Sequence, residues 1–130
     1  MRRMFLNGTA MSGQPDHAAI TGATFLGEVR TAPRYRFIAV RDSYPGLLPV
    51  AAGGSSILGE LYEMSEEILF GSLMPAEPEE LELGTTELES GEIVNSMHLQ
   101  VERIRAGEQI VDISAIGSWR AYLQTLSNRD

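Results

Sequence analysis

The sequence predicts an α+β domain whose strands form a partly closed sheet or a small barrel. Six runs with strand character follow one another along most of the chain, and two short segments have helical patterns. Consecutive strands of this kind favour a curled sheet over a layered α/β fold. A length of 130 residues suits one compact unit, so we expect residues 1–130 to form a single domain.

The first predicted strand, at residues 3–6, ends in a turn of small residues. The apolar stretch Met4-Phe5-Leu6 runs directly into Asn7-Gly8-Thr9-Ala10. Small residues leave the backbone N–H groups of such a turn uncovered, and these groups can hold an anion or a polarised carbonyl. The turn is therefore the first candidate wall of a binding pocket.

Proline and glycine divide the segments that follow. We expect a helical turn at residues 17–20 and then strands at residues 24–31 and 35–40, with a bend between them. Residues 42–49 have the composition of a turn-rich loop, and they contain Tyr44-Pro45-Gly46. This turn signature gains functional interest only if the fold places it beside the first loop.

The second half of the chain predicts a strand, a helix, a hairpin and a closing helix. Residues 56–64 are the most strand-like run, and Ser65 is a candidate N-cap for a helix that reaches about Leu73. Pro75 and Pro78 are expected to prevent its continuation. Residues 81–88 and 93–101 predict two strands joined by the turn Glu89-Ser90-Gly91-Glu92, and residues 115–126 predict the last helix.

Composition excludes several classes of chemistry. The chain has no cysteine and no lysine, and its two histidines have no metal-ligand spacing, so we expect no metal and no cofactor. The net charge of −8 without a basic stripe argues against nucleic acid as a partner. No apolar run is long enough for a membrane span or a secretory signal, which predicts a cytoplasmic protein.

Two carboxylates stand out as candidates for acid/base chemistry. Glu60 shares an apolar strand face, where it must be either protonated or paired, and the structural alternative is an ion pair with Arg36 or Arg120. Glu77 lies between two prolines, in a rigid segment that can direct its side chain into a cleft. The alternative for Glu77 is a solvated acidic loop, because other glutamates follow it closely.

The order of these motifs resembles the gamma-glutamylcyclotransferase-like superfamily. Asn7-Gly8-Thr9-Ala10 stands where members have a Tyr-Gly-Ser-like loop, and it is followed by Tyr44-Pro45-Gly46-Leu47 and Gly59-Glu60-Leu61-Tyr62. Within the superfamily the chain is most similar to the C-terminal domain of allophanate hydrolase, through Thr31-Ala32-Pro33-Arg34-Tyr35-Arg36 and Gly117-Ser118-Trp119-Arg120-Ala121-Tyr122-Leu123.

This resemblance implies a six-stranded barrel-like mixed sheet with a few short flanking helices, and a pocket for a small amide or carboxylate. Asn7, Gly8, Thr9, Ala10, Tyr44, Pro45 and Gly46 would bind the substrate. Glu77 would be the catalytic general acid/base, as in cyclotransferases that act on γ-glutamyl amines. Asn7 replaces the tyrosine of the family loop and Pro75 interrupts the preceding helix, so a second hypothesis stays open. It is a non-catalytic domain that pairs with a second copy or with an amidase.

Overall fold

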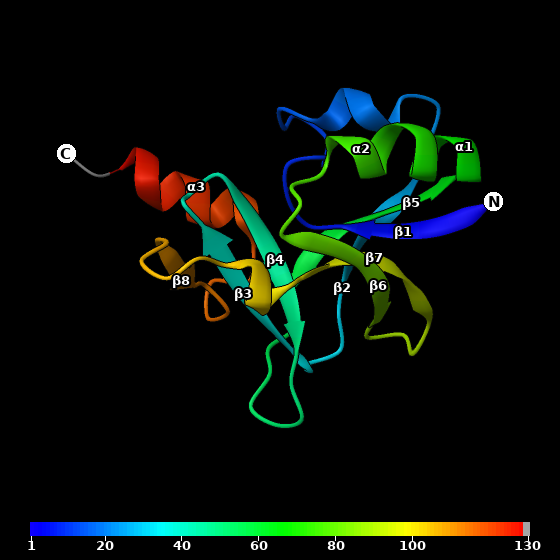
Figure 1. Cartoon of the computed structure of the whole chain (residues 1–130). Helices are drawn as coiled ribbons and strands as arrows, with labels where there is room; N and C mark the ends of the chain where they lie inside the picture. Colours follow the sequence, from blue (N-terminus) through cyan, green and yellow to red (C-terminus); the bar gives the residue numbers. More distant parts are fainter. Residues whose placement is uncertain (129–130) are drawn as a thin grey trace.

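The computed structural model describes residues 1–128 and shows a curled sheet of eight strands flanked by short helices (Figure 1). The strand order is β2-β5-β1-β7-β4-β3-β8, and β6 also pairs with β7. The strands are β1 (Arg2–Leu6), β2 (Thr24–Arg30), β3 (Tyr35–Val40), β4 (Tyr44–Pro49), β5 (Leu58–Met64), β6 (Leu81–Glu87), β7 (Ile93–Leu99) and β8 (Ile110–Asp112). The predicted α+β class is confirmed, with β4 and β8 added to the six expected strands.

Strand β7 organises the sheet because it pairs with three other strands. β6 runs antiparallel along its whole length, so β1 and β4 share the opposite edge, and both are parallel to β7. β1 meets β7 at Phe5↔Ser96, whereas β4 meets it further along, at Leu47↔His98. The two strands therefore diverge from each other at this edge, and a wedge opens between the end of β1 and the start of β4.

The curled sheet is closed where β2 and β6 end. Thr31 bridges Leu88, the Ala32 N–H donates to the Glu87 carbonyl at 2.9 Å, and the Glu89 N–H donates to the Arg30 carbonyl at 3.0 Å. Closure shields apolar side chains from water, and Phe5, Phe37 and Ile57 are almost fully buried in the core.

Most of the predicted loop at residues 42–49 is a strand, β4 (Tyr44–Pro49). β4 pairs with β3 from Val40↔Tyr44 to Tyr35↔Pro49. The turn comes earlier, because Arg41 and Asp42 both have positive φ (52° and 55°) and the Ser43 N–H donates to the Val40 carbonyl. This tight hairpin turn contains neither glycine nor asparagine, so the local sequence does not predict it.

The helical segment after β5 runs further than predicted. It consists of α1 (Glu66–Ile68), a π-helical turn at Leu69–Leu73 and α2 (Met74–Ala76), and Ser65 caps its start as expected. The prediction that Pro75 ends the helix is wrong. The Met74 N–H donates to the Leu69 carbonyl five residues back, and this wider turn accommodates a residue that lacks an N–H.

The closing helix α3 (Trp119–Ser127) begins later than predicted because Ser118 caps it, accepting a hydrogen bond from the Ala121 N–H. Trp119 is buried in the core at 1% exposure. In Figure 1, α1 and α2 lie over the part of the sheet formed by β1 and β5, and α3 lies beside β3 and β4. No helix within residues 1–128 has both the length and the apolar character of a membrane span.

The register of β1 against β5 leads to a test at two glycines. A Cβ at Gly59 would lie 2.5 Å from the Leu6 carbonyl oxygen and 2.6 Å from the Phe5 ring, whereas a Cβ at Gly71 would meet nothing within 4 Å. We expect Gly59→Ala to destabilise the fold by about 1–3 kcal/mol through overpacking. The control Gly71→Ala should be neutral or stabilising by up to about 1 kcal/mol, because alanine favours helix. Urea unfolding measures both, and equal effects would contradict the register.

Candidate functional site

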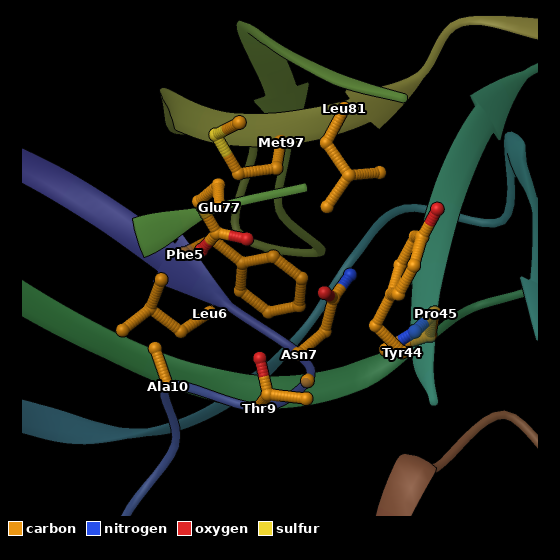
Figure 2. Close-up of a pocket in the computed structure, with 11 residues that line it drawn as sticks. Phe5, Leu6, Asn7, Thr9, Ala10, Tyr44, Pro45, Glu77, Leu81 and Met97 are labelled. Carbon is orange, nitrogen blue, oxygen red and sulfur yellow. The ribbon is translucent and has the colours of Figure 1, made fainter. Parts of the chain in front are cut away.

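A small pocket occupies the wedge between the end of β1 and the start of β4 (Figure 2). Its walls come from six segments: β1, the loop after it, β4, the residue after α2, and the facing strands β6 and β7. The lining residues are Phe5, Leu6, Asn7, Gly8, Thr9, Ala10, Tyr44, Pro45, Glu77, Leu81 and Met97. The fold thus brings together seven of the eight residues that the sequence singled out.

A close contact between Gly8 and Pro45 holds the two predicted motifs side by side. A Cβ at Gly8 would lie 2.7 Å from Pro45 Cδ, so only glycine permits this approach. Gly46, the eighth predicted residue, lies behind the wall. A Cβ there would meet Leu99 at 2.8 Å and Leu81 at 3.0 Å, which explains the glycine by packing rather than by ligand contact.

Hydrogen bonds to its own backbone carbonyl groups hold the loop after β1 in shape. The Met11 N–H donates to the Gly8 carbonyl at 3.1 Å, and the Asp16 N–H donates to the Thr9 carbonyl at 2.8 Å. His17 Nδ1 lies 2.9 Å from the Ala10 carbonyl oxygen. These contacts give the pocket floor a defined shape.

Glu77 points its carboxylate into the pocket, on the side of Asn7 (Figure 2). It follows α2 with extended backbone (φ −82°, ψ 148°), and this turn out of the helix directs the side chain inward. Burial raises the pKa of Glu77 to about 7, and the negative charge of Asp16 adds to the effect. Glu77 is therefore present in both protonation states near neutral pH.

Asn7 is the pocket residue whose polar groups are least satisfied. It is 9% exposed, and Nδ2 is the single buried side-chain nitrogen or oxygen without a hydrogen-bond partner in residues 1–128. Its carboxamide lies between the Glu77 carboxylate and the Tyr44 ring in Figure 2. The sequence identified Asn7 as a member of the loop, but an unpaired donor becomes visible only in three dimensions.

Glu60, the other candidate carboxylate, is a structural residue outside the pocket. It accepts hydrogen bonds from the Ser12 N–H and Oγ, both at 2.8 Å, and from the Tyr62 hydroxyl at 3.0 Å. Of the two predicted arginine partners, Arg120 is the one it pairs with, at 3.2 Å, while Arg36 pairs with Asp112. Burial alone would raise the pKa of Glu60, but these donors outweigh it and the pKa is lowered.

Tyr44 forms a neutral wall of the pocket. Its hydroxyl donates to Glu80, which also pairs with Arg41 at 3.5 Å. Burial and the Glu80 carboxylate raise the pKa of Tyr44, so the phenol keeps its proton. Sequence reasoning does not place Glu80, Leu81 or Met97 at the pocket, because their positions depend on the pairing of distant strands.

The pocket is small. Its cavity volume is about 20 Å³, which is enough for one or two water molecules or for one small functional group. Within residues 1–128, no three histidine or acidic side chains gather closely enough to hold a metal ion.

The sequence profile of the allophanate hydrolase C-terminal domain matches residues 2–124, nearly the whole chain. The chain belongs to the allophanate hydrolase C-terminal domain family. Urea amidolyase from Saccharomyces cerevisiae is a relative, 32% identical over 95% of the chain. The chain spans only 7% of that protein's length, so this domain is a small part of the yeast protein.

Two solved structures place the family domain in a wider context. A uropathogenic E. coli-specific protein is 28% identical, with a TM-score of 0.83, and the match covers 95% of both chains. An AIG2-like protein from Mus musculus is 24% identical, with a TM-score of 0.60 over 82% of this chain and 80% of that one. This second likeness concerns the fold alone, and it supports the gamma-glutamylcyclotransferase-like architecture expected from the motifs.

Glu60 and its partners Ser12, Tyr62 and Arg120, which we call the Glu60 cluster, lead to a prediction about the stability of the fold. Glu60→Ala removes the acceptor for Ser12 and Tyr62 and leaves Arg120 without its partner, so we expect a loss of about 2–4 kcal/mol. The control is Glu28→Ala. Glu28 is paired in register with Glu60 but exposed, so its loss should stay within about 0.5 kcal/mol. Urea unfolding at pH 7 measures both variants, and a loss below 1 kcal/mol for Glu60→Ala would contradict the assigned role.

The raised pKa of Glu77 predicts how stability depends on pH. A carboxyl whose folded-state pKa of about 7 exceeds its ordinary 4.5 stabilises the fold below pH 4.5, and this stability is lost as pH rises towards 7. Glu77→Gln should therefore match wild type near pH 4.5 and be more stable at pH 8, by up to about 3 kcal/mol. Urea unfolding at the two pH values tests this. The exposed neighbour substitution Glu79→Gln serves as control, and a constant difference between wild type and Glu77→Gln would refute the prediction.

Proposed function

We propose that this chain binds a small amide or carboxylate in the pocket at Asn7–Ala10 and that Glu77 exchanges a proton with the bound compound. The observation that carries the proposal is a carboxyl group with a pKa of about 7 that points into a pocket floored by a polar loop. A proton donor and acceptor works best when its pKa lies near the operating pH, because both forms are then available.

The size of the pocket favours a compact compound over a γ-glutamyl amine. A cavity volume of about 20 Å³ encloses a single small group, so a γ-glutamyl chain would not be enclosed within it. The family and the yeast relative carry the names of allophanate and urea, which are compact amides. Compounds of this class are the first ligands to test.

A second candidate function is a non-catalytic domain that pairs with an amidase or with a second copy of itself. It is favoured by the yeast relative, in which the matching domain is a small part of a much longer protein. The acidic second half of the chain, with 4 arginines against 13 acidic residues in 66–130, would attract a basic surface on an amidase partner electrostatically.

The decisive experiment is a panel of ligands and substrates tested on three proteins: wild type, Glu77→Gln and the control Glu79→Gln. Urea, allophanate and γ-glutamyl amines are added separately, and binding is followed by amide chemical shifts while product release is followed by chromatography. We expect a compact amide or carboxylate to shift the signals of Gly8–Ala10. We also expect Glu77→Gln to lower any turnover by about 10²-fold or more, with Glu79→Gln unchanged.

A panel in which no compound binds the pocket would favour the interaction candidate. If no compound shifts the pocket signals, the small-molecule proposal fails and the interaction candidate takes its place. Size-exclusion chromatography of the chain, alone and mixed with the amidase portion of a urea amidolyase, then measures whether it pairs with itself or with that partner.

A further inference from the structure

We propose that Asn7 is the specificity-determining residue of the pocket and that its side-chain amide donates a hydrogen bond to a carboxylate oxygen of the ligand. This inference rests on the proposed function and narrows it, because it selects a small carboxylate over a neutral amide. It also assigns a role to a side chain that the resemblance marks only as a departure from the family tyrosine.

The first support is the unsatisfied Nδ2 of Asn7. Buried polar groups in folded proteins nearly always have a partner, and an unpaired buried donor destabilises the protein that contains it. Nδ2 is without a partner in residues 1–128, and Asn7 lines the pocket with only 9% of its surface exposed. A ligand oxygen placed in the pocket would accept the hydrogen bond that the protein itself does not complete.

The second support is the presence of Asn7 and Glu77 in the lining of the same pocket. Glu77 and Asn7 both line the same small space, with the Asn7 carboxamide between the Glu77 carboxylate and the Tyr44 ring, and burial together with Asp16 disfavours the ionised form of Glu77. A protonated Glu77 is a second donor, so the pocket offers two donors to one group. A carboxylate suits this arrangement because it accepts at both oxygens and has no donor of its own. The ligand and Glu77 would then share one proton between two carboxyl groups.

The charged and titratable groups around Glu77 determine how the pocket can accept a negatively charged ligand. Tyr44 of β4 stays neutral, and its hydroxyl is held by Glu80, which pairs with Arg41 outside the pocket. Asp16 stands before the helical turn at His17–Ile20, and the His17 ring contacts the Ala10 carbonyl. None of the residues that line the pocket is an arginine, so a carboxylate ligand would be held by hydrogen-bond donors, and the proton on Glu77 would remove the repulsion that an ionised Glu77 exerts.

The shape of the pocket limits the carboxylate to a short one. Leu6, Leu81 and Met97 form apolar walls beside the polar floor, and the space holds one small planar group. Acetate fits this description: its carboxylate would face Asn7 and Glu77 and its methyl group would face the apolar walls. Acetamide has the same shape without the charge, so it is the matched neutral probe.

The test is a titration of wild type, Asn7→Leu and Asn7→Asp with acetate and with acetamide, followed by amide chemical shifts of the pocket. We expect wild type to bind acetate more tightly than acetamide. Asn7→Leu should weaken acetate binding at least tenfold while the protein remains at least as stable as wild type, because the unpaired donor is removed. Asn7→Asp, which nearly preserves the side-chain shape, should also lose acetate through charge repulsion. It supplies the test independently if Asn7→Leu fails to fold.

The pH dependence provides a second readout. Because acetate would bind the form with protonated Glu77, its affinity should fall about tenfold between pH 6 and pH 8, and Glu77→Gln should abolish this dependence. Acetate binding that is unchanged in Asn7→Leu would overturn the role of Asn7. Binding of acetamide in preference to acetate would overturn the carboxylate assignment but leave the proposed function in place. If neither compound shifts the pocket, this inference fails, whereas the proposed function is decided by the separate panel of urea, allophanate and γ-glutamyl amines.

Discussion

The buried Glu60 cluster is the constraint on which the arrangement of the site depends. It joins the loop after β1 at Ser12, the strand β5 at Tyr62 and the helix α3 at Arg120. A buried carboxylate is tolerated only when its oxygens are satisfied, so the three elements must arrive together. The loop that begins at Asn7 passes through Ser12 on its way to the helical turn at His17–Ile20, so the cluster holds the loop just beyond the pocket floor, while the contact of Gly8 with Pro45 holds it near its start.

Much of the fold was accessible from local sequence, and the exceptions have specific causes. Alternating apolar residues and the hairpin turn at Glu89–Glu92 identified the strands that became β6 and β7. β4 was missed because Tyr44-Pro45-Gly46 is a common turn signature, whereas the real turn uses positive φ at Arg41 and Asp42. β8 is only three residues long and depends on pairing with β3, which no local pattern records.

Part of the lining of the pocket could be predicted from the sequence, but its apolar walls and its geometry could not. The order of motifs placed Asn7–Ala10, Tyr44-Pro45 and Glu77 in one pocket, and the structure brings them together. The wedge itself arises because β1 and β4 share one edge of β7, a long-range pairing that also places Met97 in the wall. Pro75 looked like an obstacle to presenting Glu77, yet the π-helical turn before it lets the helix continue until Glu77 turns inward.

Glu60 and Glu77 show how one fold gives two carboxylates opposite properties. Both are removed from water, and burial raises the pKa of each. Glu60 is surrounded by donors, which reverse the effect and keep it ionised as a structural anchor. Glu77 faces Asp16 instead and retains a pKa of about 7. The donor that its surroundings do contain, Asn7 Nδ2, has no partner in residues 1–128. The pocket therefore combines three features: an anchored floor, a carboxyl that changes protonation near neutral pH, and an unpaired donor. These features suit an oxygen-bearing group that exchanges a proton.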